Sequence, residues 1–155
     1  STDYDVVKEF LIRIFKIEKT IPKYILYLRP TTPIRSVDIL EKAIQKIKKL
    51  NNYDSLISVH KMAEPVHKKF FIKNKQLKSV FSQMSLDKSN APRQNFPNSY
   101  TANGYLDIIK SNNVLKHKKY LNKRCFPFLV PKAVDIDTKF DLTLAKFLIS
   151  KKNYV

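Results

Sequence analysis

The sequence predicts an α/β domain in which helices cover a mostly parallel β-sheet. A nearly continuous apolar segment at 24–28 reads as a buried parallel strand, and a proline-containing loop follows at 29–35. A helical pattern from Ser36 and a second strand candidate at 55–59 come next. Strand, loop, helix and strand in this order form the building unit of layered α/β sheets. Ligands of such sheets bind beyond the carboxyl ends of the strands, so the 29–35 loop is a candidate binding loop.

Three segments have the periodicity of amphipathic helices. Apolar pairs recur every four residues in 5–19, and 36–50 carries an apolar stripe behind Ser36, a residue preferred at helix N-caps. A third helix is expected over 138–150. Its inward face is predicted to consist of Phe140, Leu144, Phe147 and Leu148.

A β-hairpin is predicted in the middle of the chain. Two β-like arms, 69–73 and 77–81, flank Asn74 and Lys75. A polar, proline-containing loop is expected over 82–98. Further strand candidates lie at 99–110, around the single glycine, and at 126–130.

Composition limits the class of protein. The 155 residues carry a formal charge of +17, one cysteine and one glycine. The GxGxxG fingerprint needs three glycines and the Walker phosphate loop needs two, so these residues contain neither. No apolar run approaches the ~20 residues of a membrane span, and the lone Cys125 forms no intrachain disulfide. We expect one cytoplasmic domain over 1–155, with 62–98 as an extension from it.

The positive charge indicates a solvated lysine surface. Lysines outnumber arginines by 25 to 5, whereas nucleic-acid readers favour arginine for bidentate contacts. We therefore expect no nucleic acid and no membrane as partner, and a modest role for the charge in attracting small anionic substrates.

Asp135 and Asp137 are the first candidates for chemistry. In an extended segment residues two apart share a face, so both carboxylates point one way and suit a hard cation such as Mg²⁺. A strand-to-helix junction with an N-cap at Asp137 or Thr138 explains the same residues equally well. Arg93, in a polar loop, suits bidentate capture of a carboxylate or phosphate, although a plain surface arginine is the simpler interpretation. The 29–35 loop, with its prolines, hydroxyls and two arginines, suits either an anion cradle or a stiff connection.

Four segments carry a resemblance to a known family. They are LRPTTPIR at 28–35, SLISVHKMAEP at 55–65, APRQNFPNSYTANG at 91–104 and VDIDTKFDLTLAKFL at 134–148. Each is modest alone, but in this order over nearly the whole chain they resemble the acylneuraminate cytidylyltransferase family, the CMP-sialic acid synthetases and their bacterial relatives.

The resemblance implies a Rossmann-like three-layer nucleotidyltransferase fold with a mixed, mostly parallel sheet, flanking helices and a protruding β-hairpin that pairs the subunits of a homodimer. It implies Mg²⁺-dependent transfer of CMP from CTP to the anomeric hydroxyl of a nine-carbon keto sugar acid, a nonulosonic acid, with release of pyrophosphate. Asp135 and Asp137 match the metal-binding pair and Arg93 the active-site arginine of catalysis. The implied substrate-binding residues are Arg29, Thr31, Thr32, Tyr100, Asn103 and Gly104.

The sequence also departs from the family pattern. Thr101 stands where an arginine is usual, Asp107 where a tyrosine is common and His67 where a lysine is usual, so the identity of the sugar acid stays open. The family's first strands and its glycine-bearing CTP loop have no counterpart here. We therefore expect exposed apolar surface, an open strand edge and no CTP-dependent activity from these residues alone. A catalytically inactive relative that serves as a dimerisation or binding module is the alternative.

Overall fold

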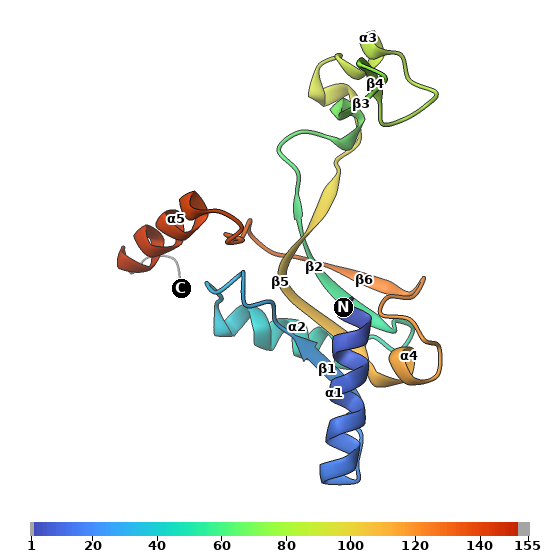
Figure 1. Ribbon diagram of the computed structural model, residues 1–155, viewed down its shortest axis with the longest axis vertical. Helices are drawn as coiled ribbons and strands as arrows, with labels where there is room; N and C mark the ends of the chain where they lie inside the picture. The colour runs from blue at the N-terminus through green and yellow to red at the C-terminus, as the bar shows by residue number, and fades with distance from the viewer. Residues whose placement is uncertain (1, 152–155) are drawn as a thin grey trace. The chain divides into compact units, whose positions relative to one another are not determined.

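The computed structural model describes residues 2–151, which divide into two compact units. One unit consists of the residues up to 59 and those from 102 onward, and the other consists of residues 60–101. Four strands form the central sheet in the order β1-β5-β2-β6 (Figure 1). Their bounds are Tyr24–Tyr27 for β1, Tyr100–Lys110 for β5, Ser55–Lys61 for β2 and Cys125–Leu129 for β6.

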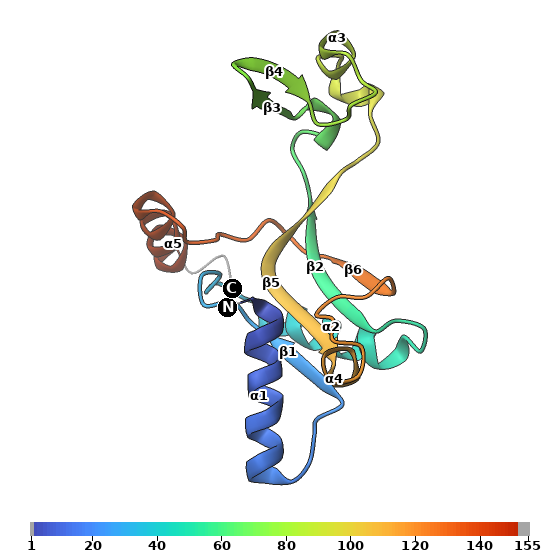
Figure 2. The ribbon, with the colours of Figure 1, turned by 45° about the vertical axis from the view of Figure 1, so that its right-hand side comes forward.

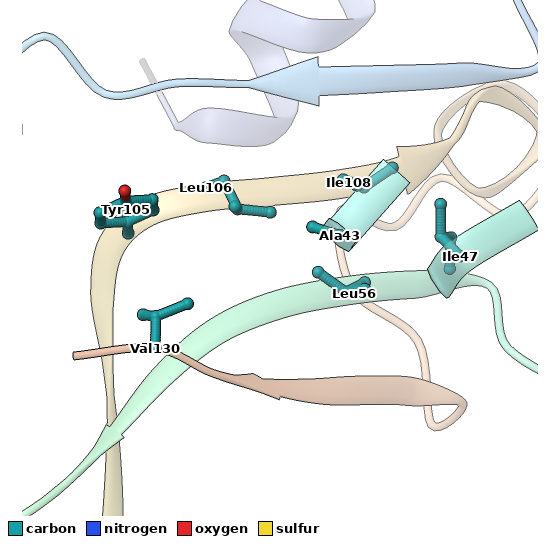
Figure 3. Close-up of a cluster of buried hydrophobic side chains, with 7 residues drawn as sticks. All are labelled: Ala43, Ile47, Leu56, Tyr105, Leu106, Ile108 and Val130. Atoms are coloured by element: carbon teal, nitrogen blue, oxygen red, sulfur yellow. The ribbon is translucent and has the colours of Figure 1, made fainter. Parts of the chain in front are cut away.

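Three of these strands run one way and β5 runs the other way. β2 and β6 pair in parallel from Ser55 opposite Cys125, whereas β1 and β5 pair antiparallel. The arrows of β5 and β2 also point in opposite directions (Figure 3). The mixed, mostly parallel sheet is therefore confirmed. The expectation of a parallel strand at 24–28 is wrong for its pairing, because β5, from far along the chain, lies beside it.

Two helices cover opposite faces of the sheet. On one face Ala43 and Ile47 of α2 (Val37–Lys49) pack with a core that includes Ile108 (Figure 3). α1 (Asp3–Glu18) lies on the other face (Figure 2). Its Val7 and Leu11 belong to a core that includes Ile109. Adjacent residues of a strand point to opposite faces, so Ile108 and Ile109 mark the two sides of β5. Helix, sheet and helix thus make the three predicted layers.

The helix ends follow from local chemistry. Thr2 and Asp5 form a capping box at the start of α1, and Thr138 and Asp141 form another at the start of α5 (Lys139–Ser150). Hydrogen bonds from Thr138 lower the pKa of the exposed Asp141. The sequence offered Asp137 or Thr138 as the N-cap of this helix, and the structure shows that the cap is Thr138.

The predicted apolar faces are only partly buried. In α1 the side chains of Val7 and Leu11 are buried, while Phe10 and Phe15 are about half exposed. In α5 the predicted inward face is wrong. Phe140, Leu144 and Phe147 are exposed and Leu148 is half-buried. The buried residue of this helix is Ala145. Helical periodicity shows that a face is apolar but not what covers it.

The predicted hairpin is confirmed in the unit of residues 60–101. β3 (Phe70–Lys73) pairs antiparallel with β4 (Gln76–Ser79). Asn74 and Lys75 both have positive φ, 52° and 60°, as the two-residue turn of a tight hairpin requires. The apolar side chains of both strands are exposed.

Short helices were missed by the sequence patterns. The predicted loop at 82–98 contains α3 (Leu86–Ser89) and a 3₁₀ turn at Arg93–Asn95, and a second 3₁₀ turn lies at Val66–Lys68. α4 (Ser111–Leu115) follows β5 directly. Each of these helices is too short to display a periodic apolar stripe. Among residues 2–151 no helix is long and apolar enough to cross a membrane.

Candidate active site

The loop after β1 and the segment before α5 meet directly, although a hundred residues separate them. The backbone N–H of Ile136 donates to the carbonyl of Thr31 at 2.8 Å. Oγ1 of Thr32 donates to Oδ1 of Asp135 at 3.3 Å. These two bonds join the first and last of the four segments that carry the family resemblance.

The other two segments reach the same place. Gly104 has φ +67°, and a Cβ atom there would lie 2.9 Å from Oγ1 of Thr32 and 3.1 Å from Cδ of Arg29. Only glycine therefore lets Thr32 and Arg29 approach β5 this closely. Next to it, Oδ1 of the buried Asn103 accepts a hydrogen bond from Oγ of Ser58 at 2.7 Å. Parts of all four segments are thus connected within one unit.

Arg35 holds the loop in shape. Its Nε donates to the carbonyl of Tyr105 and its Nη2 to the carbonyl of Arg29, each at 2.6 Å. Burial lowers the pKa of Arg35. The hydroxyl of Tyr105 in turn accepts from the N–H of Ser36. The guanidinium of Arg35 donates to backbone carbonyls and stabilises the shape of the loop. The loop is therefore a rigid connection as well as a candidate anion-binding loop.

Arg29 lies between two carboxylates. Its Nη2 donates to Asp3 at 2.8 Å and to the buried Asp107 at 3.1 Å, and Tyr120 donates its hydroxyl to Asp107 at 2.7 Å. Burial opposes the charge on Arg29, but the two carboxylates raise its pKa above the ordinary value. Burial raises the pKa of Asp107, against the hydrogen bonds of Tyr120 and Arg29. Burial and the nearby Asp107 also raise the pKa of Tyr120.

Sequence reasoning missed most of this network. The resemblance singles out Asp107 as a departure from the family pattern, and no motif points to Asp3 or Tyr120. One signal was available: Asp107 is a charged residue inside the apolar run of β5, where a charge needs a partner. Its partners come from distant segments and could not be deduced from spacing.

Asp135 and Asp137 are both exposed. Asp137 contributes its backbone N–H to Asp141, and Asp135 accepts the hydroxyl of Thr32. Within residues 2–151 no group of three or more His, Cys, Asp or Glu side chains gathers as a metal cage. Two exposed carboxylates fit the sites of Mg²⁺ that are completed by water and substrate phosphates, since carboxylate oxygen is the hard donor this cation prefers.

Two predicted site residues belong to the other unit. Arg93 is exposed and lines a cavity of about 480 Å³ together with Lys61, Phe96 and Ser99. Tyr100, at the start of β5, is 48% exposed. His67 is stacked between Phe81 and Phe96, with ring centroids at 4.6 and 5.4 Å, so its ring is a packing element.

Comparison with known proteins shows a fold shared with cytidylyltransferases. No family model and no curated protein sequence matches the chain. A solved CMP:2-keto-3-deoxy-manno-octonic acid synthetase in complex with CTP superposes with a TM-score of 0.61 at 11% identity, covering 98% of this chain and 69% of that one. A 4-diphosphocytidyl-2C-methyl-D-erythritol synthase from Anaerococcus prevotii superposes with a TM-score of 0.57 at 10% identity, covering 97% and 67%. At these identities the likeness establishes the nucleotidyltransferase-like architecture.

The burial of Asp107 predicts how stability changes with pH. The raised pKa means that the folded protein keeps a proton that the unfolded chain releases above about pH 4. Asp107 therefore makes the wild type less stable as the pH rises through this window. Asp107→Asn cannot ionise, so its free energy of unfolding should rise relative to that of the wild type between pH 4 and 7 in urea titrations.

Asp38→Asn, at an exposed position of α2, is the control for the loss of one negative charge. A difference between Asp107→Asn and the wild type that stays constant, or falls, as the pH rises would contradict the account of Asp107.

Proposed function

We propose that this chain belongs to a cytidylyltransferase that transfers CMP from CTP to the anomeric hydroxyl of a nonulosonic sugar acid. The observation that carries the proposal is the contact of residues 31–32 with residues 135–136, beside Gly104. It brings the segments that resemble the acylneuraminate cytidylyltransferases together in space. The nucleotidyltransferase-like fold supports the same reaction class, and one protein of that fold is a sugar-acid synthetase complexed with CTP.

In this reaction the anomeric hydroxyl attacks the α-phosphorus of CTP. The new bond from oxygen to phosphorus forms as the bond from the α-phosphorus to the pyrophosphate oxygen breaks, and the proton of the hydroxyl is released to water. Asp135 and Asp137 would hold Mg²⁺, which when bound stabilises charge on the phosphates. Arg93 would pair with an anionic group of the substrates.

The substrate side of the proposed site is assigned to the loop after β1 and to the start of β5. Arg29 lies between Asp3 and Asp107, so these carboxylates fix the position of its guanidinium. The side chain of Arg29 also lies against Gly104. Thr31 is exposed beside it, and Asn103 and Gly104 shape the backbone opposite. Tyr100 is proposed as an aromatic contact of the sugar acid.

Binding tests this proposal better than turnover does. With a single glycine, these residues contain no glycine-rich phosphate loop, so we expect the chain by itself to release no pyrophosphate from CTP. Isothermal titration should instead detect Mg²⁺-dependent binding of CTP, and binding of N-acetylneuraminate or 2-keto-3-deoxy-manno-octonate. Asp137→Asn should weaken the Mg²⁺-dependent binding of CTP by about tenfold or more.

The exposed Asp38→Asn is the matched control and should bind as the wild type does. If neither CTP nor a sugar acid binds in the presence of Mg²⁺, the transferase proposal fails and the inactive binding or dimerisation module takes its place.

We propose in addition that the hairpin pairs two copies of the chain. Phe71, Ile72 and Leu77, on the two strands of the hairpin, are 48%, 77% and 48% exposed. Contiguous exposed apolar surface is typical of interaction sites. Phe71 and Leu77 line a cavity of about 510 Å³ together with Val80 and Leu86. A second copy of the hairpin would bury this surface.

Sedimentation velocity tests this pairing. The wild type should sediment as a dimer, and Ile72→Asp should sediment as a monomer because a carboxylate cannot be buried unpaired at an apolar interface. Ile17→Asp, on α1 and 74% exposed, is the matched control and should remain dimeric. A monomeric wild type, or equal dissociation of both variants, would rule the hairpin out as the interface.

A further inference from the structure

Thr32 is a fully buried hydroxyl that meets an exposed carboxylate. Its side chain has 0% exposure, and its Oγ1 donates to Oδ1 of Asp135 at 3.3 Å. A hydroxyl that is covered by protein does not present itself to a ligand in the solvent. Its described side-chain partner is the carboxylate of Asp135.

The surroundings of Thr32 define where its hydroxyl lies. Gly104 packs against it so closely that a Cβ atom there would fall 2.9 Å from Oγ1. The neighbouring hydrogen bond from the N–H of Ile136 to the carbonyl of Thr31 fixes the backbone directly after Asp135. The donor and the backbone of its acceptor are therefore both held.

A donor of this kind changes what a carboxylate can do. An exposed aspartate samples several orientations of its carboxyl plane, and ordering it costs conformational entropy when a cation binds. A hydrogen bond to one oxygen orients the group and leaves the other oxygen for the cation. Partners that hold metal ligands in this way commonly change metal affinity by 10–100-fold.

From this geometry we infer that Thr32 is a positioning residue for Asp135 as a metal ligand. The inference rests on the proposed function, because it takes Asp135 and Asp137 as the Mg²⁺ carboxylates. The family resemblance places Thr32 beside the sugar, whereas this inference assigns it to the orientation of the metal-binding carboxylate of Asp135.

The affinity of the chain for Mn²⁺, measured by water-proton relaxation, tests the role of Thr32 without turnover. Thr32→Val keeps the shape of the side chain and removes the hydroxyl, so it should bind Mn²⁺ about tenfold more weakly than the wild type. Thr32→Ser keeps the hydroxyl and should bind within about twofold of the wild type. Thr143→Val makes the same change on the exposed face of α5 and should leave Mn²⁺ binding unchanged.

A purely structural role would give a different result. Thr32→Val would then accelerate hydrogen exchange of the Ile136 amide while binding Mn²⁺ as the wild type does, and this outcome overturns the inference. If Thr32→Val does not fold, Thr32→Ala and Thr32→Ser differ from each other by one oxygen and replace it, with Ser expected to bind tenfold tighter.

The failure of the proposed function has its own signature. Asp135→Asn and Asp137→Asn should each weaken Mn²⁺ binding at least as much as Thr32→Val does. If both bind Mn²⁺ as the wild type does, the metal site is not at these carboxylates, and the proposed function and this inference fall together. Loss of binding in the two Asp variants with full binding in Thr32→Val overturns the role of Thr32 alone.

Discussion

Two hydrogen bonds, from Ile136 to Thr31 and from Thr32 to Asp135, connect the loop after β1 to the segment that precedes α5. Without them Asp135 and Asp137 would lie on an exposed segment with no fixed relation to the sheet. Gly104 makes these bonds possible, because a side chain at its position would collide with Thr32 and Arg29. The single glycine of the chain thus stands where the backbone of β5 must come closest to the loop.

A second constraint is the balance of charge around Arg29. The chain carries a large positive excess, yet this arginine is held by Asp3 and by Asp107, which Tyr120 also contacts. A buried carboxylate is tolerated only when donors surround it. Arg29 and Tyr120 supply these donors to the buried Asp107. This group of residues sets the local environment of the loop after β1.

Local patterns in the sequence predicted much of the fold. The helices around Val7, Ala43 and Ala145 and the hairpin at Asn74 and Lys75 follow from side-chain periodicity, capping residues and turn chemistry, which act over a few residues. The antiparallel neighbour of β1, the exposure of Phe140 and the links of Asp107 depend on segments that meet only in three dimensions. The candidate site divides in the same way. The motifs identified Asp135, Thr32 and Gly104 as candidates. Only the structure shows that Thr32 is buried and donates to Asp135, and that Arg93 belongs to the unit of residues 60–101.

Asp135 and Asp137 are proposed to form a cation site held by the loop after β1. Paramagnetic broadening of backbone amide signals by Mn²⁺ tests it most directly, because the effect falls steeply with distance from the bound ion and does not require tight binding. The account predicts that the amides of residues 135–137, 31–32 and 104 broaden first as Mn²⁺ is added in substoichiometric amounts. Earlier broadening around another carboxylate, such as Asp38 or Asp87, or uniform broadening over all acidic residues, would contradict it.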